Sequence, residues 1–578
     1  MKKNLLCILT DEDEYLKNKK NFLIIDKNIL DMLNVRNFFN KKRKYLYVNN
    51  INNEINNKNH INRNIFFVKK KFLIYKKQLV KKLNQYHNIS EDNSYWGKIV
   101  DSWLLNLIVI TKFRFDNLLF LHKKYNNIYI ANENRIKIYN NSEDFYQDAS
   151  YCGKINQFIY SRIAKVLGIN VSKNIYLKNY SYKNYFIDFK GFIFKIIFIL
   201  YIKLFKPIVF FSTDFSRFDK IKLFILSKGN IFFNNINYLK KKSFFNKNLD
   251  KNFRKTLKFN EIDNFDKSIN ALIQDLIPTS FVENFFLIRK DLDVYSRHLS
   301  GVGTSYNFYS DDLYKILSAE ILKNKGKLFI FEHGHYHLFY NRDLRFDIEK
   351  NNLDFYFMWN SKNGIGTANF SHLGSSQKNQ NNNTNITLFL EPKHKYNIKL
   401  TDTLSKDLKE KSLASFSFYN YLSPSLKSEF VLRPPQINSY DFQQWDKILY
   451  KNKKEKSGII NLSSNSKNLL HNTRIFVANY FGNSFFEALY LNIPIVIFFD
   501  LNLCNFNKET KLIFNKFKKL NIFHENAKSA SDFINLNYDT INSYWNSKDI
   551  QEALNDFRSK FFNKKINYIK NILYKTYI

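Results

Sequence analysis

Cysteine is almost absent from this sequence. Its three cysteines, Cys7, Cys152 and Cys504, lie far apart and form no C-x-x-C pair. This spacing excludes a disulfide framework and a zinc site built on cysteine ligands. A chain without disulfides is typical of a reducing compartment, so we expect a cytoplasmic protein.

Glycine and proline are also scarce, at 14 and 7 of 578 residues. The sequence contains no G-x-x-x-x-G-K-S/T phosphate loop, no G-x-G-x-x-G after an expected strand and no G-x-S-x-G nucleophile turn. Gly301-Val302-Gly303 is too short to count as a dinucleotide-binding motif. Nothing in the sequence therefore supports a P-loop NTPase or an enzyme with a serine nucleophile elbow.

Long apolar runs are missing as well. The most apolar stretch, residues 191–211, is interrupted by Lys195, Lys203 and Lys206, so its uncharged runs are too short to span a bilayer. We expect an internal helix or strand there, with a membrane-touching segment as the less favoured alternative. Residues 4–9 form a short apolar run that acidic residues end, which predicts a first strand rather than a signal peptide.

Acidic residues are few relative to basic ones. The chain has 90 Lys plus Arg against 51 Asp plus Glu, a formal net charge of +39. One interpretation is an anionic partner, and the other is codon usage, because the abundant Lys, Asn, Ile, Phe and Tyr share AT-rich codons. The lysines are scattered and follow no nucleic-acid-binding motif, so we expect no nucleic acid partner. Peripheral contact with an anionic membrane is the partner interaction that such a charge favours.

What the sequence does contain is a pattern of short apolar strands alternating with amphipathic helices. Hydrophobic residues make up 44% of the chain and aromatic residues 17%, enough for a sizeable core. The pattern predicts the α/β class, although residues 40–90 resist assignment and residues 239–266 are expected to be a polar surface excursion. The expected strands are 4–9, 21–25, 208–212 (ending at Thr213-Asp214), 327–331, 386–390, 474–478 and 493–499. The expected helices are 95–121, a segment opened by Ser310 and ended by Gly326, 484–491 and a tail at 550–569.

The first candidate site is Glu332-His333-Gly334-His335, directly after the expected strand 327–331. Ligands bind beyond the carboxyl ends of strands in open α/β sheets, and histidine is the natural general base near neutral pH. His333, His335 and His337 also alternate, which would put them on one face of an extended segment. That alternation leaves a metal site open as an alternative.

A second candidate site is the stretch from Asn479 through Gly482, Asn483 and Ser484 to Glu487, which joins an expected strand to a helix. Backbone N–H groups at such a helix start favour a phosphate, and a Glu one turn later could bind ribose hydroxyls. Ser484 and Glu487 also have the spacing of an S-x-x-E capping box, which would explain both without a ligand. Both interpretations stay open on spacing alone.

The third candidate is Arg433, which precedes Pro434-Pro435. An Arg held by a rigid backbone could pair bidentately with a phosphate, and the alternative is a solvated Arg in a surface turn.

In this order, these segments resemble a bacterial family of transferases found in surface-polysaccharide and lipopolysaccharide gene clusters, which is itself similar to GT-B glycosyltransferases. Glu332-His333-Gly334 resembles the family's Gln-His-Gly-Gly motif, with Glu in place of Gln and His335 in place of the second Gly. The other resembling segments are Tyr95-Trp96-Gly97, Asp101 to Leu104 with Arg114, Ile277-Pro278 with Glu283, Asp354 to Trp359, Thr473-Arg474 through Glu487 to Pro494, Ile522 to His524, and Trp545.

The resemblance implies two Rossmann-like domains facing a cleft, with residues 1–305 on the acceptor side, 306–535 binding a nucleotide sugar and 536–578 forming a helical tail that packs back. It implies a metal-independent glycosyltransferase without a cofactor, which moves a sugar from a nucleotide-sugar donor to a polysaccharide or lipid-linked acceptor at the inner face of the membrane. His333 would be the base, and Arg433, Gly482, Asn483, Ser484 and Glu487 would hold the donor, with Glu332, Gly334, His335 and Asn479 as further pocket residues. A metal-dependent hydrolase and a non-catalytic polyanion-binding protein remain the alternatives.

Overall fold

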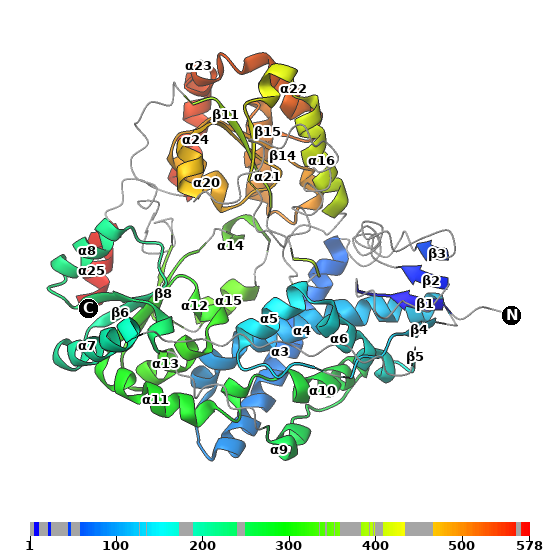
Figure 1. The fold of residues 1–578 in the computed structure, drawn as a ribbon, viewed down its shortest axis with the longest axis vertical. Helices are drawn as coiled ribbons and strands as arrows, with labels where there is room; N and C mark the ends of the chain where they lie inside the picture. The colour runs from blue at the N-terminus through cyan, green and yellow to red at the C-terminus, as the bar shows by residue number, and fades with distance from the viewer. Residues whose placement is uncertain are drawn as a thin grey trace.

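The computed structural model describes residues 5–10, 21–24, 44–47, 58–125, 128–134, 136–172, 189–239, 249–333, 336–341, 344–351, 353–358, 383–391, 394–396, 398, 408–433, 466–561 and 568–577. These residues form an α/β protein with three five-stranded sheets, in which every pairing between named strands is parallel. The α/β class is confirmed, but three sheets stand where two were expected. Figure 1 shows the first and middle sheets in one lobe and the third sheet in another.

The first sheet has the strand order β3-β2-β1-β4-β5. Its strands are β1 (Leu5–Ile8), β2 (Asn21–Ile24), β3 (Lys44–Tyr47), β4 (Ile128–Ile130) and β5 (Asn170–Val171), and the helices with it are α3 (Lys58–His87), α4 (Asn93–Lys124), α5 (Ser142–Tyr151) and α6 (Gly153–Val166). α3 fills most of the stretch that sequence analysis left unassigned.

The middle sheet has the order β10-β9-β8-β6-β7. Numbered along the chain within this sheet, the strands lie 2-1-3-4-5, the flavodoxin-like doubly wound order. Its elements are α7 (Phe189–Phe205), β6 (Ile208–Phe211), α8 (Arg217–Leu226), β7 (Ile231–Asn234), η2 (Ile236–Leu239), α9 (Lys251–Thr256), α10 (Asn264–Leu276), η4 (Thr279–Phe281), α11 (Phe285–His298), β8 (Gly301–Thr304), α12 (Asn307–Ser310), α13 (Asp312–Lys323), β9 (Lys327–Phe331), α14 (Tyr336–Phe339), α15 (Leu344–Asn351) and β10 (Phe355–Phe357).

The third sheet, β12-β11-β13-β14-β15, repeats the 2-1-3-4-5 order. Its elements are β11 (Asn385–Phe389), α16 (Leu408–Tyr421), α17 (Pro424–Lys427), β12 (Phe430–Arg433), α19 (Ser466–His471), β13 (Thr473–Ala478), α20 (Asn483–Tyr490), β14 (Ile495–Phe498), η8 (Leu501–Leu503), α21 (Lys508–Lys519), β15 (Phe523–His524), α22 (Ala527–Asn537), α23 (Ile541–Trp545), α24 (Lys548–Phe561) and α25 (Tyr568–Tyr577).

The boundary expected after residue 305 falls inside the middle sheet. β8 lies before residue 305 and β9 after it, and the two are hydrogen-bonded neighbours, with Val302 opposite Leu328. The expected tail does cross between lobes. α24 packs Leu554 and Phe557 into the core of the third sheet, whereas α25 packs Ile569 and Ile572 against the middle sheet.

The helix α4 is the central element of the larger lobe. Its 32 residues are about 48 Å long at the rise of an α-helix, and it is buried on every side. Trp96 and Trp103, which carry part of the family resemblance, are fully buried in one core that reaches from Cys7 of the first sheet to Val302 of the middle sheet. α4 therefore holds the two sheets together.

One local expectation from the sequence is wrong. The helix after residue 310 is capped by Asp311, whose side chain accepts from the backbone N–H of Tyr314, because Ser310 belongs to the preceding short helix α12. Of the surface excursion expected at residues 239–266, residues 240–248 lie outside the described residues, and much of the rest is exposed. This segment is anchored at Arg254. Arg254 there is buried, and its guanidinium lies 2.6 Å from the carboxylate of Glu283.

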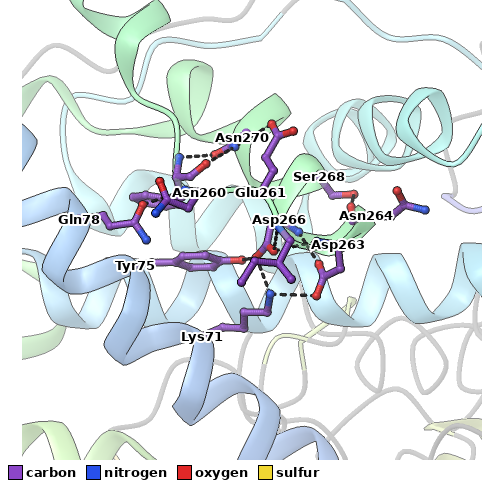
Figure 2. A network of polar contacts seen from close by, with 12 residues as sticks. Lys71, Tyr75, Gln78, Asn260, Glu261, Asp263, Asn264, Asp266, Ser268 and Asn270 are labelled. Atoms are coloured by element: carbon purple, nitrogen blue, oxygen red, sulfur yellow. Dashed lines mark hydrogen bonds and ion pairs between the residues drawn. The ribbon is translucent and has the colours of Figure 1, made fainter.

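A polar network ties α3 to the start of α10 (Figure 2). Asp263 and Asp266 form the capping box of α10, and Lys71 of α3 lies 2.9 Å and 2.5 Å from their carboxylates. The Tyr75 hydroxyl also donates to Asp266. Burial opposes ionisation of Asp266, but the hydrogen bonds from Lys71 and Tyr75 outweigh it and hold the pKa of that carboxyl below its ordinary value. The capping charges thus also fasten one helix to another.

None of the described helices combines the length and the uninterrupted apolar character that crossing a bilayer requires. The apolar stretch at residues 191–211 is divided between the helix α7 and the strand β6.

We predict that His87 makes the fold less stable in acid. The ring is 4% exposed at the end of α3, packs against Phe285, and has Nε2 2.9 Å from the Phe281 carbonyl oxygen. Burial lowers its pKa from 6.5 to about 4. Between these two pKa values the unfolded chain binds a proton at His87 and the folded chain does not. The contribution of neutral His87 to the free energy of unfolding is therefore present in full above the unfolded pKa and is lost as the pH falls towards 4.

The measurement is denaturant unfolding at about pH 7 and at about pH 5. Between these two values the His87 contribution to the free energy of unfolding is expected to fall by about 2 kcal/mol. In His87→Gln this part of the pH dependence should disappear, while in the matched control His122→Gln, at an exposed position of α4, it should persist. An unchanged pH dependence in His87→Gln would rule out this origin.

Candidate functional site

The carboxyl edge of the middle sheet gathers three side chains from three neighbouring strands. Asp214 follows β6, Tyr306 follows β8 and His333 follows β9. Because β6 and β8 flank the point where the strand order reverses, their carboxyl ends open a crevice at which α/β proteins bind ligands. His333 thus lies where the sequence predicts it, beside two partners that were not foreseen.

Asp214 holds the other two side chains. The Tyr306 hydroxyl donates to Asp214 Oδ1, and His333 Nδ1 lies 3.5 Å from Asp214 Oδ2. The rings of Tyr306 and His333 meet edge to face, with centroids 4.2 Å apart. With Nδ1 directed at a carboxylate, the opposite nitrogen Nε2 is the one available to a ligand, which is the arrangement of a general base oriented by an acid.

The backbone around the crevice is fixed by local hydrogen bonds. The Thr304 hydroxyl accepts from the N–H groups of Tyr306 and Asn307 at 3.1 Å and 3.0 Å, which turns the chain sharply after β8. Ser212, after β6, has a φ of 48°, in the left-handed region that non-glycine residues seldom adopt. Such backbone geometry clusters at functional sites.

A cavity of about 340 Å³ adjoins this crevice. Phe210 and Phe233 form its apolar wall, and Lys220 of α8 reaches into it. Among the described atoms, the Thr213 hydroxyl and the Asn234 amide nitrogen are buried without a hydrogen-bond partner, and both residues line the cavity. Leaving a buried polar atom unpaired is costly, so these two are candidates to bind a polar ligand. Burial lowers the pKa of Lys220, although Asp214 nearby favours its charged form.

Glu332 does not open onto the cavity. Its side chain is 3% exposed, its N–H donates to the Phe357 carbonyl at 2.9 Å, and its charge contributes to the raised pKa of Tyr356. The side chain of Glu332 is therefore buried at the end of β9, and its pocket role stays a prediction. Gly334 and His335 lie outside the described residues, and so does the side chain of His337. Within the described part of the chain, no group of three His, Cys, Asp or Glu side chains could hold a metal ion.

The third sheet gathers its own set of polar residues at its carboxyl edge. Arg433 ends β12 opposite Phe389 of β11, which in turn lies opposite Ala478 of β13. Glu391 follows β11 and Asn479 follows β13, on the two sides of the strand-order reversal. The predicted donor-binding residues are therefore brought to the point where a doubly wound sheet binds ligands.

Charged groups surround the phenol of Tyr480 at this edge. Burial raises the pKa of Tyr480, and so do the carboxylates of Glu487 and Glu391, whereas a hydrogen bond with the Ser484 hydroxyl at 3.1 Å and the Arg433 guanidinium act in the opposite direction. Arg433, Ser484 and Glu487 therefore all act on this one phenol, and Glu391 does so as well. Their role as a donor-binding set stays a prediction.

The capping box expected from Ser484 and Glu487 does not form. The N-cap of α20 is Gly482, without a side-chain cap, and Ser484 lies inside the first turn. Asn483 begins the helix with a side-chain oxygen that is buried and unpaired among the described atoms. Asn479 is also buried, and its amide donates to the hydroxyl of Ser415 on α16 at 2.7 Å. The first turn of α20 therefore has N–H groups that no side-chain cap satisfies.

The two edges lie near each other. The segment after His333 enters the smaller lobe at Phe339, whose ring lies 4.7 Å from that of Phe481, and whose carbonyl accepts from Asn507 at 2.9 Å. The six residues from His333 to Phe339 span at most about 21 Å. Figure 1 shows α14, which contains Phe339, between the lobes.

A second connection joins the helices that follow the two edges. The pKa of Tyr490, at the end of α20, is raised by burial and by the carboxylate of Asp219 on α8. α20 begins at the candidate donor-binding loop, and α8 follows Asp214.

At the strand-order reversal of the first sheet, the described residues bury the polar side chains between the strand ends. Thr10, after β1, donates to Gln157 at 3.2 Å, and Gln157 donates to the Ala131 carbonyl after β4 at 2.6 Å. Both side chains are buried, so α6 closes the strand-order reversal of this sheet.

These features define a doubly wound α/β protein with an oriented histidine at one sheet edge and a helix start beside an arginine at another. The chain belongs to the LIC12162 family of transferases, whose family model matches residues 5–576. No curated protein matches the chain.

We predict that Asn483 has no structural role at the start of α20. Its buried side-chain oxygen has no partner in the described structure, so Asn483→Ala should change the free energy of unfolding by less than about 0.5 kcal/mol. The matched control is Asn507→Ala at the start of α21, where the Asn507 oxygen accepts from Thr510 N–H at 2.9 Å. Loss of that cap should cost about 1 kcal/mol in a denaturant titration. Equal losses in both variants would show that Asn483 is a structural cap.

Proposed function

We propose that this transferase moves a sugar from a nucleotide-sugar donor to a surface-polysaccharide or lipid-linked acceptor. The observation that carries the proposal is the pair of polar sets, His333 with Asp214 at one sheet edge and Arg433 with the start of α20 at another. Membership of a transferase family supports group transfer, and the two edges supply one place for each substrate. In this proposal the larger lobe, which includes His333, serves the acceptor, and the third sheet serves the donor.

The donor binds at the smaller lobe. The free N–H groups at the start of α20 and the partial positive charge of the helix end bind its phosphates. Arg433 pairs with a second phosphate oxygen, and Glu487 accepts hydrogen bonds from the ribose hydroxyls. Asn483 supplies its side-chain amide.

The acceptor binds at the larger lobe. A sugar hydroxyl next to His333 Nε2 loses its proton to that nitrogen as its oxygen attacks the anomeric carbon of the donor. The bond from the anomeric carbon to the phosphate oxygen breaks, and its electron pair leaves with the nucleotide. Fixed dipoles at the start of α20 and the Arg433 guanidinium stabilise the charge on that leaving phosphate, so the mechanism needs no metal. Thr213 and Asn234 bind acceptor hydroxyls in the cavity.

A nucleotide sugar of the right class is expected to raise the melting temperature of the protein. Saturation at one hundred times the dissociation constant adds about 2.7 kcal/mol of stability. A panel of CMP-, UDP-, GDP- and dTDP-sugars at fixed salt, followed by thermal unfolding, identifies the base. The shift should be lost in Glu487→Gln and Arg433→Gln and retained in the control Glu509→Gln, in the first turn of α21.

If no nucleotide sugar shifts the melting curve, the donor assignment is wrong. Destabilisation by a chelator instead would favour the metal-dependent hydrolase.

Removal of His333 is expected to slow transfer without weakening donor binding. Turnover is measured as the release of free nucleotide from the nucleotide sugar that raises the melting temperature. His333→Ala should lower that rate by about 100-fold, the usual contribution of a general base, and leave the thermal shift intact. Asp214→Asn should lower it less, because the base remains but is no longer held. A near wild-type rate in His333→Ala would refute its role as base, and His122→Gln is the control.

A further inference from the structure

The edge of the middle sheet at β7 exposes a large apolar surface. Its most exposed side chains are Ile197, Leu200 and Leu204 on α7 and Phe218, Ile221 and Ile225 on α8, each more than half exposed. Single exposed apolar residues are normal, but a continuous set on two neighbouring helices marks an interaction site. We call this set the β7-edge surface.

Both helices are held firmly, so the exposure is a fixed property of the fold. α7 buries Phe198 and Ile202 in the main core, and α8 buries Leu223 against the opposite face of the sheet. The apolar side chains opposite these anchors therefore point away from the protein.

The β7-edge surface wraps around the edge of the sheet, because the two helices lie on opposite faces and approach each other at the edge strand β7. The ring of Phe232 on β7 lies 4.9 Å from Tyr201 of α7 and 6.3 Å from Phe224 of α8. The Tyr201 hydroxyl also donates to the carbonyl of Gly229, in the turn that ends α8. Figure 1 shows α7 and α8 together at one side of the larger lobe.

Basic residues surround the β7-edge surface. Lys203, Lys206, Arg217, Lys222 and Lys228 are exposed on or beside the two helices. The carboxylates between residues 195 and 230 are Asp214, which accepts from Tyr306, and Asp219, which is buried. The surface therefore combines an apolar centre with a positive rim.

We propose that the β7-edge surface docks on an anionic lipid bilayer. Helices with an apolar face and a lysine-rich rim lie in the interface of such membranes, where apolar burial and charge attraction add together. A second copy of this chain is disfavoured as the occupant, because the same lysines would face each other on a protein of net charge +39. The proposal does not depend on the proposed function, since docking requires neither substrate.

The test is flotation of the full chain with vesicles of phosphatidylcholine and with vesicles of an equimolar mixture of phosphatidylcholine and phosphatidylglycerol. The protein is expected to float with the anionic vesicles. The triple variant Leu204→Ser, Phe218→Ser, Ile225→Ser should reduce the bound fraction at least about tenfold. Its matched control replaces three equally exposed apolar residues elsewhere, Ile262, Leu512 and Leu536, by Ser, and should bind as the wild type does.

A charge variant tests the rim. Lys203→Gln, Lys206→Gln, Lys222→Gln should weaken binding to the anionic vesicles, whereas the same loss of charge at the exposed Lys251, Lys255 and Lys528 should not. Unfolding curves recorded for every variant separate lost docking from lost folding. Wild-type binding by the Ser triple variant, or equal loss in its control, overturns the proposal. So does a wild-type dimer that the Ser triple variant converts to monomer in sedimentation equilibrium, which would assign the surface to self-association.

Discussion

Burial of α4 on all sides is the constraint on which the larger lobe depends. A helix that is apolar around its whole circumference needs partners in every direction, and α4 finds them in α3, α6 and α13. One continuous core then serves two sheets, which fixes the middle sheet against the first. Trp96 and Trp103, fully buried, supply much of the contact area. The shared core of the larger lobe therefore fixes the strands that carry Asp214 and His333.

The parallel arrangement of the strands explains why polar residues converge at only one edge of each sheet. All carboxyl ends of a parallel sheet lie on the same side, and at the strand-order reversal no crossover helix covers them. In the middle sheet Asp214 lies beside this position, and in the third sheet Glu391 and Asn479 follow the two strands that flank it, with Arg433 on the next strand, β12. In the first sheet, whose strand order differs, the buried side chain of Gln157 lies between the ends of β1 and β4.

The sequence predicts the local elements well and their convergence poorly. The strand 474–478 and the helix after it were foreseen, because buried parallel strands read as short apolar runs and a helix start follows a polar loop. His333 was foreseen as a residue at a strand end for the same reason. Asp214 was seen to end a strand, yet its partnership with His333 could not be predicted, because β6 and β9 become near neighbours only through the strand order. Strand order is not a local property of the chain.

Helix caps and helix boundaries likewise depend on tertiary contacts that the sequence does not show. Ser310 and Asp311 are both good caps, and the choice of Asp311 depends on α12, a four-residue helix with no clear signal. In α3, Lys71 lies on the buried side of the helix and pairs there with Asp263 and Asp266, a partnership that no local pattern of the chain predicts. The third sheet was not counted separately because the middle sheet straddles the expected boundary. In each case tertiary contacts decided between patterns that the sequence left equally plausible.

The helix α8 has two dissimilar sides, and together they set how substrates reach the protein. Lys220 lines the cavity beside His333, while Phe218 and Ile221 on the outer side belong to the β7-edge surface. If that surface rests on lipid, the cavity lies about one helix diameter, roughly 10 Å, above the headgroups. An acceptor anchored in the bilayer would then find the enzyme by lateral diffusion in two dimensions. The donor would arrive from bulk water on the side of the smaller lobe, and the spent nucleotide would return there while the lengthened glycolipid drifts away in the plane of the membrane.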